Sequence, residues 1–169
     1  MSGGAVRVRS AAAADVPRIV ELERSVSEAP HWAEAEYRAI VEAADGSEGV
    51  LRCLLVAESG GQIAGFAVGK LLRFTGEAEL ESVAVAPELR RGGFGRTLCA
   101  DVLAWCKERS AAFVELEVRA GSAGAIALYR SLGFLEVGLR PDYYSAPAED
   151  AVLMRLELDG CGESALPVD

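Results

Sequence analysis

Alternation of apolar and polar positions along the first half of the chain predicts one strand, two helices and a hairpin. Residues 5–9 (AVRVR) alternate as a half-buried strand does. Residues 11–28 and 31–46 place apolar side chains at helical spacing, so we expect two helices there. Residues 50–74 contain two apolar runs joined by a Gly-Gly pair, a pattern typical of a tight β-hairpin.

The second half alternates strands with helices. Residues 78–86 read as a strand, and a helix with an apolar face begins near Phe94 and is followed by a strand at 112–120. This order is a βαβ unit, which pairs its two strands in parallel. A further helix and two strands are expected at residues 122–134, 135–140 and 150–158. The fold class predicted is therefore α/β (α+β), with a mixed sheet flanked by helices.

Chain length and composition predict a single domain. The 169 residues are 51% hydrophobic, which is enough for a sizeable core, and no linker, repeat or low-complexity segment divides them. We expect one domain over residues 1–158 and a flexible tail over 159–169. The chain has no apolar run of membrane-spanning length and no signal-peptide pattern at its start, so we expect a cytoplasmic protein that does not bind membranes.

Charge and cysteine usage narrow the function classes further. A net charge of -9 disfavours nucleic acid as a partner and slightly favours a basic macromolecule. The four cysteines, Cys53, Cys99, Cys106 and Cys161, form no CxxC pair and have no metal-ligand spacing with the single histidine, His31. We expect buried, reduced thiols and no metal site.

A glycine-rich turn stands between the strand at 78–86 and the following helix. The segment VAPELRRGGFGRTL (85–98) places three glycines and three arginines at the helix start. Glycine lets successive backbone N–H groups turn toward one point, and the helix amino end adds partial positive charge. The segment therefore predicts a pyrophosphate cradle. It is not a Walker A loop, which needs Gly-Lys-Ser/Thr, nor a Rossmann fingerprint, because Leu98 stands where the third glycine would be.

The pattern from Arg90 to Gly95 resembles the acetyl-CoA signature of the GNAT superfamily of N-acyltransferases, and the order of strands and helices matches that fold. Two further segments, LEVRAGSAGAIALYRSLGF (116–134) and DYY with EDAVLM (within 142–154), resemble the RimI-type branch, the ribosomal-protein N-terminal alanine acetyltransferases. The resemblance implies a GNAT fold, in which the mixed, mostly antiparallel sheet contains a central parallel pair of strands that splay apart.

The same resemblance implies where acetyl-CoA binds. Pantetheine is expected in the gap between the splayed strands, paired with backbone around Ser82, Val83 and Val85. Ser122 stands where the branch usually has a cofactor-binding asparagine, and its shorter side chain predicts a weaker or water-mediated contact. The remaining cofactor contacts are expected from the glycine-rich turn, namely Arg90, Arg91, Gly92, Gly93, Gly95 and Arg96.

Acetyl transfer to an amine needs a proton acceptor, because an α-amine with a pKa of about 8 is mostly protonated at neutral pH. The resemblance places this general base at Glu117 and the general acid for the leaving thiolate at Tyr129. Glu79, on the neighbouring strand, matches the base of other branches and ranks second. Without the resemblance, Glu117 reads as a solvated strand residue and Tyr129 as a core aromatic.

The acceptor is less closely determined. In related enzymes the first two helices and the loop between the last strands line a peptide groove, which makes His31, Trp32, Tyr143 and Tyr144 candidates, although Trp32 also fits a core position. We expect a protein or peptide N-terminus, with a basic ribosomal protein as one possibility and a small first residue in a pocket walled by Trp32 and the two tyrosines. A small-molecule amine N-acetyltransferase and a non-catalytic acyl-CoA-binding module remain alternatives, and the sequence leaves the oligomeric state open.

Overall fold

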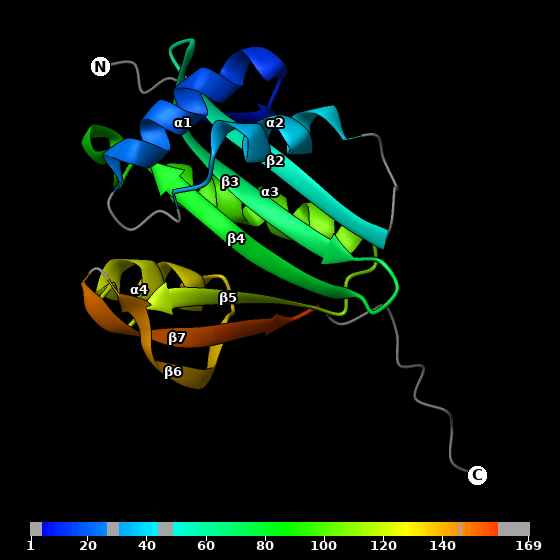
Figure 1. The fold of residues 1–169 in the computed structure, drawn as a ribbon, viewed down its shortest axis with the longest axis vertical. Coiled ribbons are helices and arrows are strands. Elements are labelled where there is room, and N and C mark those ends of the chain that lie inside the picture. The colour runs from blue at the N-terminus through cyan, green and yellow to red at the C-terminus, as the bar shows by residue number, and fades with distance from the viewer. Residues whose placement is uncertain (1–4, 27–30, 44–48, 146, 159–169) are drawn as a thin grey trace.

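The protein folds around one sheet. The structure, a computed structural model, describes residues 5–26, 31–43, 49–145 and 147–158. Seven strands lie in the order β1-β2-β3-β4-β5-β7-β6 (Figure 1). They are β1 (Arg7–Ser10), β2 (Val50–Ser59), β3 (Gln62–Leu72), β4 (Glu77–Val85), β5 (Phe113–Arg119), β6 (Leu135–Ser145) and β7 (Ala148–Glu157).

Among the described residues, α-helices and short 3-10 helices connect these strands. They are η1 (Ala13–Asp15), α1 (Val16–Ser25), α2 (Glu34–Glu42), η3 (Pro87–Leu89), α3 (Phe94–Glu108) and α4 (Ala123–Ser131). Helices α1 and α2 are shorter than predicted, and the predicted ends at residues 27, 28 and 44–46 lie outside the described residues. No helix among the described residues combines the length and apolar character needed to span a bilayer.

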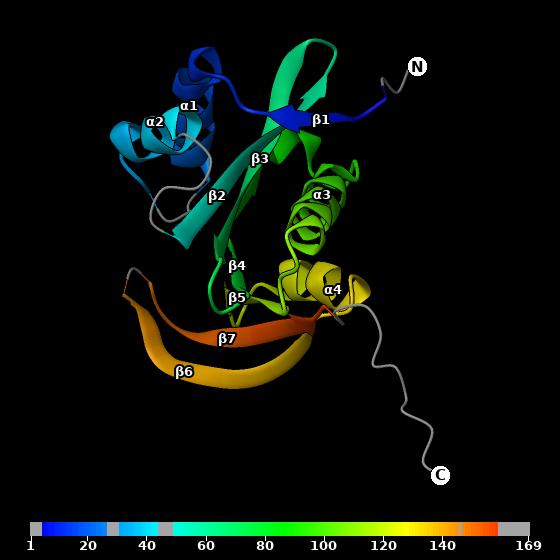
Figure 2. The same ribbon diagram turned by 90° about the vertical axis from the view of Figure 1, so that its right-hand side faces the viewer.

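The sheet separates two hydrophobic clusters. Helices α1 and α2 cover one face and helices α3 and α4 cover the other (Figure 2). The α1/α2 cluster includes Ile19, Tyr37 and Phe66, whereas the α3/α4 cluster includes Leu98 and Phe134. The predicted hairpin joins β2 and β3, and its Gly60 and Gly61 take left-handed φ angles of 59° and 77°, which favour glycine.

A β-bulge in β4 inverts the side-chain alternation of that strand. Val68 of β3 pairs with Ser82 and Gly69 pairs with Leu80, so Glu81 is an extra residue. Before the bulge Leu80 packs into the α3/α4 cluster, while beyond it Ala84 packs into the α1/α2 cluster. The even-numbered residues of β4 therefore face the α3/α4 cluster before the bulge and the α1/α2 cluster after it, although buried positions alternate regularly along the strand.

Strands β4 and β5 form the predicted parallel pair, and they separate after three residues. Pairing is confined to Glu77–Phe113, Ala78–Val114 and Glu79–Glu115. Beyond these positions the two strands diverge, while β4 stays paired with β3 up to Val85 (Figure 1). The mixed, mostly antiparallel sheet with a splayed central pair is thus confirmed, and we call the region where the strands part the fork.

The last two strands are longer than predicted. The sequence predicted β6 at 135–140 with Tyr143 and Tyr144 in a loop, and this loop placement was wrong because β6 continues to Ser145. Register shifts on β6, between Glu136 and Gly138 and between Arg140 and Tyr144, absorb the extra residues. These irregularities disrupt the alternation that would have revealed the full strand.

Candidate functional site

A cavity of about 230 Å³ opens at the base of the fork. It is lined by residues of β3, β4, β5, β6 and β7, and its polar side chains are mostly charged. The lining residues are Lys70, Leu72, Glu77, Ala78, Glu79, Phe113, Glu115, Leu116, Glu117, Arg140 and Leu153. We call this the fork pocket.

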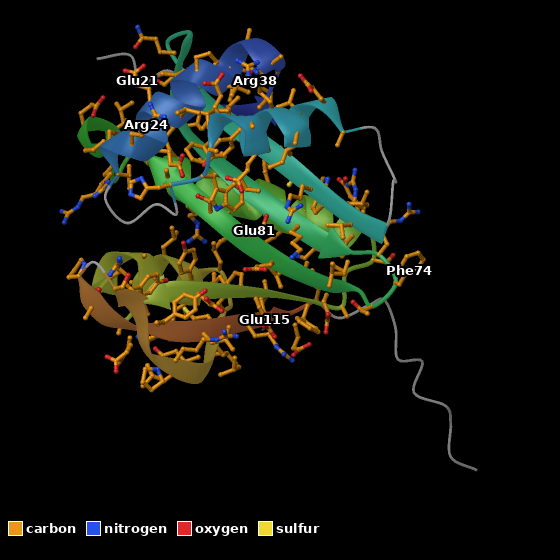
Figure 3. All side chains as sticks on the ribbon, viewed as in Figure 1. Glu21, Arg24, Arg38, Phe74, Glu81 and Glu115 are labelled. Atoms are coloured by element: carbon orange, nitrogen blue, oxygen red, sulfur yellow. The ribbon has the colours of Figure 1, made fainter. Side chains whose placement is uncertain are left out.

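Strand register explains why charges gather there. One cross-strand row of paired positions runs over five strands through Arg52, Lys70, Glu79, Glu115 and Arg155. The two carboxylates of this row stand opposite each other where the parallel strands part. Side chains two residues apart share a face of a strand, which adds Glu117 to the same side as Glu115. Figure 3 labels Glu81 on β4 and Glu115 on β5, one on each side of the fork.

Most of these carboxylates have a cationic partner. Glu81 pairs with Arg52 at 3.0 Å, and Glu115 forms an ion pair with Arg155. Glu117 pairs with Arg140, with 3.3 Å between Nε and Oε1.

Glu79 differs, because within the described part of the chain it has no ion pair or side-chain hydrogen bond of its own. Burial raises the pKa of Glu79, and the charges of Glu81, Glu117 and Glu115 raise it further, while Lys70 acts in the opposite direction. The surroundings of Glu79 therefore favour the protonated form of its carboxyl group.

The two candidate catalytic residues occupy different surroundings. Glu117 lines the fork pocket, whereas Tyr129 on α4 is not among the lining residues. Tyr129 packs edge-to-face on Phe134, with ring centroids 5.9 Å apart, at the border of the α3/α4 cluster. Burial raises the pKa of Tyr129 well above that of a free phenol, so the hydroxyl stays protonated.

The glycine-rich turn ends at the start of α3. Gly93 precedes the helix with a left-handed φ of 82°, and the first helical hydrogen bond runs from the Thr97 N–H to the Gly93 carbonyl at 3.0 Å. The N–H groups of residues 94–96 come before that bond and have no partner within the helix. A Cβ placed on Gly93 would meet no protein atom within 4 Å, whereas one on Gly95 would face Val85 and Leu128. The side-chain direction of Gly93 therefore faces open space, and Gly95 lies beside the end of β4.

Four further residues predicted to bind the cofactor lie in this turn, on α3, before α4 and on β4. Arg91 takes a left-handed φ of 67°, and Arg96 donates a hydrogen bond to the Ser131 hydroxyl of α4 at 2.6 Å. Ser122 precedes α4, and its side chain does not cap the helix, which leaves the hydroxyl available. Ser82 is buried and its hydroxyl has no hydrogen-bond partner among the described residues. A buried hydroxyl without a partner next to an unpaired strand edge fits a bound polar chain such as pantetheine.

The residues predicted to line a peptide groove are divided. Trp32 lines a second cavity of about 280 Å³ between α2 and β2, which includes neither tyrosine. Tyr143 and Tyr144 lie on β6 and pack edge-to-face, with ring centroids 5.0 Å apart. Interaction with the Glu117 carboxylate, followed by partial desolvation, raises the pKa of Tyr143 to about 12. His31 is exposed, with a φ of 55°. The structure therefore ties Tyr143, and not Trp32, to the fork pocket.

Sequence reasoning missed several residues of the site. Lys70, Glu115 and Arg140 line the fork pocket, and the alternation of VELEV in β5 could have shown that Glu115 shares a face with Glu117. Nothing local pointed to Arg140, because it reaches Glu117 across an intervening strand.

Three of the four cysteines are buried, reduced thiols, as predicted. Cys53, Cys99 and Cys106 are free, and burial raises their pKa values to about 11, about 12 and about 12. The fourth, Cys161, lies outside the described residues.

Comparison with known proteins gives consistent matches. Residues 16–134 match the acetyltransferase (GNAT) family. The [ribosomal protein bS18]-alanine N-acetyltransferase of Escherichia coli K12 is 35% identical over 146 residues, which is 85% of this chain and 92% of that protein.

Solved structures match over similar lengths. The crystal structure of the ribosomal-protein-S18-alanine N-acetyltransferase from Escherichia coli aligns with a TM-score of 0.78 and 32% identity, over 96% of this chain and 99% of that one. A putative acetyltransferase from Salmonella typhimurium, solved with its cofactor acetyl-CoA, aligns with a TM-score of 0.77 over 98% and 99% of the two chains. Its identity of 24% supports the likeness of fold alone.

Proposed function

The chain belongs to the acetyltransferase (GNAT) family, and we propose that it acetylates the N-terminal α-amine of a ribosomal protein that begins with alanine. Family membership makes it an acetyl-CoA-dependent N-acetyltransferase. The observation that carries the choice of acceptor is the 35% sequence identity between this chain and the bS18-alanine N-acetyltransferase, over 92% of that protein. We place the reaction in the cytoplasm, where ribosomal proteins are made.

The fork and the glycine-rich turn would hold acetyl-CoA, which supplies an activated acetyl thioester when bound. The N–H groups at the start of α3, with the positive end of the helix dipole, suit its pyrophosphate. The open β4 edge beyond Glu79 suits the amide groups of pantetheine. The residues that we assign to this role are Ser82, Val83, Val85, Arg90, Arg91, Gly92, Gly93, Gly95, Arg96 and Ser122.

We assign proton removal from the acceptor amine to Glu117. A general base must lie within hydrogen-bond reach of the reacting nitrogen, directly or through one water. Glu117 lies on the strand that borders the fork, lines the pocket and is mostly buried, with 20% of its side chain exposed. When nitrogen attacks the thioester carbonyl, the C–N bond forms, the C–S bond breaks and Glu117 takes the amine proton. Glu79 shares the pocket, and its unpaired carboxylate makes it the second candidate.

Tyr129 is assigned as the acid that protonates the departing thiolate. Tyr129 is partly buried and desolvation raises the pKa of its phenol, so the phenol keeps its proton at neutral pH and can donate it when the C–S bond breaks. The edge-to-face contact with Phe134 packs the ring at the border of the α3/α4 cluster. Tyr129→Phe removes this proton and preserves the packing, which makes it the matched test of the role.

The fork pocket also suits a cationic acceptor. Four carboxylates line it against one lysine and one arginine, so its net charge is negative. An N-terminal ammonium, and basic residues that follow it, would lower the repulsion among these carboxylates. The overall charge of -9 acts in the same direction at longer range.

The acceptor is tested with acetyl-CoA and synthetic peptides, with mass spectrometry to locate the acetyl group. A basic peptide that begins with alanine should be modified at its α-amine. The same peptide with a blocked α-amine but free lysines should stay unmodified. Modification of lysine side chains alone, or turnover of spermidine without turnover of the peptide, would refute the proposed acceptor.

The assigned residues are tested in the same assay. We expect Glu117→Gln and Tyr129→Phe each to lower kcat by about 10²- to 10⁴-fold, as loss of a positioned proton-transfer group does. Glu136→Gln is the matched control, because Glu136 is an exposed strand carboxylate that pairs with an arginine, Arg130, and is not among the residues lining the fork pocket. Full activity of the Glu117→Gln variant with loss of activity in Glu79→Gln would transfer the role of base to Glu79.

A further inference from the structure

We propose that Arg140 is a positioning residue for proton transfer, which orients the Glu117 carboxylate and stabilises its negative charge in the fork pocket through their ion pair. The inference rests on the proposed role of Glu117 as the base. It concerns a residue that neither touches the reacting atoms nor belongs to the glycine-rich turn.

The contact itself is direct. The Nε atom of Arg140 lies 3.3 Å from Oε1 of Glu117, and both side chains line the fork pocket. An ion pair of this length holds one carboxylate oxygen and leaves the other available to accept a proton. Arg140 is 54% exposed, so we expect the pair to add little to stability and to act mainly on the charge and orientation of Glu117.

The structure of β6 explains how Arg140 reaches Glu117. Strand β7 lies between β6 and β5, and the position opposite Arg140 is Ala151, whose small side chain leaves room above β7. The register of β6 shifts directly after Arg140, where Asp142 takes a left-handed φ of 52° and donates its N–H to Asp150 at 2.9 Å. The bulge sets the position of Arg140 against β7.

The same bulge brings Tyr143 to Glu117. Tyr143 lies beside Glu117, whose carboxylate raises the pKa of the Tyr143 phenol. The Arg140 guanidinium lies 5.7 Å from the centroid of the Tyr143 ring. The neighbouring Tyr144 is braced in turn by Arg119, whose guanidinium lies 4.2 Å from its ring centroid. On the β6 side the Glu117 carboxylate is therefore ion-paired with a cation and flanked by a phenol.

The surroundings of Glu117 show why a cation is needed. Titratable and charged side chains surround Glu117 on five strands. They are Glu115 and Arg119 on β5, Glu79 on β4, Lys70 on β3, Arg140, Tyr143 and Tyr144 on β6, and Arg155 on β7. Arg155 is engaged with Glu115, and Arg119 with Glu149. Two neighbouring carboxylates thus repel the charge of Glu117, and Arg140 is the cation paired with it. Removal of Arg140 should favour proton uptake by Glu117 and so remove the base at lower pH.

The test compares pH profiles of kcat/KM for the acceptor. The ratio of a variant to the wild type at each pH cancels the titration of the acceptor amine. For Arg140→Gln we expect this ratio to fall several-fold below neutral pH and to recover at high pH, which corresponds to a shift of the acidic limb by about half a pH unit or more. Arg140→Lys keeps the charge and should recover most of the loss, and KM for acetyl-CoA should not change.

Arg130→Gln is the matched control. Arg130 forms an ion pair with Glu136 between α4 and β6, and both side chains are exposed outside the pocket. Its removal should leave the ratio at one across the pH range. A pH-independent ratio for Arg140→Gln, or an equal effect of Arg130→Gln, would overturn the proposal.

A double-mutant cycle separates this proposal from the proposed function. In the Glu117→Gln background, Arg140→Gln should cause no further pH-dependent loss, because its effect passes through the carboxylate. An undiminished effect in that background would show that Arg140 acts elsewhere. If the wild type acetylates only a small amine, the proposed acceptor fails, yet the same cycle can be run on that amine and still decides the role of Arg140.

Discussion

Glu23 allows a stability prediction with a matched internal control. It lies on α1 at a position of the apolar stripe and is fully buried, while Glu21 and Arg24 of the same helix are exposed (Figure 3). Its Oε1 accepts the Trp32 N–H at 2.6 Å, which ties α1 to the segment that precedes α2. Within the described residues its Oε2 has no hydrogen-bond partner, nor has the buried hydroxyl of Tyr37.

The magnitude follows from what each substitution leaves behind. Glu23→Ala leaves the Trp32 N–H without its acceptor, which costs about 1–3 kcal/mol of unfolding free energy. Part of this cost is offset because a buried charge is removed as well. Glu23→Gln retains the acceptor oxygen without the charge and should change stability by less than about 1 kcal/mol. For a chain of this size each kcal/mol corresponds to about 2–4 °C in Tm.

Glu36→Ala is the control, because Glu36 makes the same kind of contact at an exposed site. Its Oε2 accepts the Ala33 N–H at 2.7 Å, one residue along the chain from Trp32. Water can replace this acceptor, so the loss should be about 0.5–1 kcal/mol. Urea unfolding followed by circular dichroism measures all three variants. A loss for Glu23→Ala no larger than that for Glu36→Ala would refute the argument that burial sets the cost.

Three further predictions concern the cofactor cradle, the fork pocket and the thiols. Gly93→Ala should weaken acetyl-CoA binding measured by calorimetry. Gly60 is also left-handed and open but lies in the β2–β3 turn, so Gly60→Ala should leave the affinity unchanged. Equal acetyl-CoA affinities of the two variants would refute the cradle. Because burial, followed by nearby carboxylates, raises the pKa of Glu79 above its unfolded value, its contribution to stability falls as pH rises through the folded-state pKa. Glu79→Gln should therefore be more stable than the wild type at pH 7 and lose this advantage below about pH 4 in urea titrations; an advantage that persists there would contradict the assignment. Burial raises the pKa of Cys99 and of Cys106 to about 12, so neither thiol should react with a disulfide reagent at pH 8 until the protein is unfolded; rapid labelling of the native protein would show that they are accessible.

Local sequence patterns predicted most helices and strands, and they pointed to the glycine-rich turn and to the β5 carboxylates of the fork pocket. A Gly-Gly pair between apolar runs correctly predicted the β2–β3 hairpin, because the turn depends on backbone freedom at two adjacent residues. The glycines before α3 predicted a cofactor cradle for the same reason, and its role stays a prediction. Alternation in β5 places Glu115 and Glu117 on one face, since side chains of a strand alternate with a period of two. The family resemblance then pointed to Glu117 and Tyr129, whose roles remain predictions.

The tertiary structure decided which strand positions pair and which charged side chains meet. The bulge at Glu81, the parting of β4 from β5 after Glu79 and the continuation of β6 through Tyr143 are properties of register between strands, and no single strand encodes its register. Arg140 reaches Glu117 across β7, and Glu23 is buried because α1 packs against the sheet. The sequence by itself determined the periodicities and the turns, which depend on neighbours along the chain. Packing determined which charges meet, because those contacts join residues far apart in sequence.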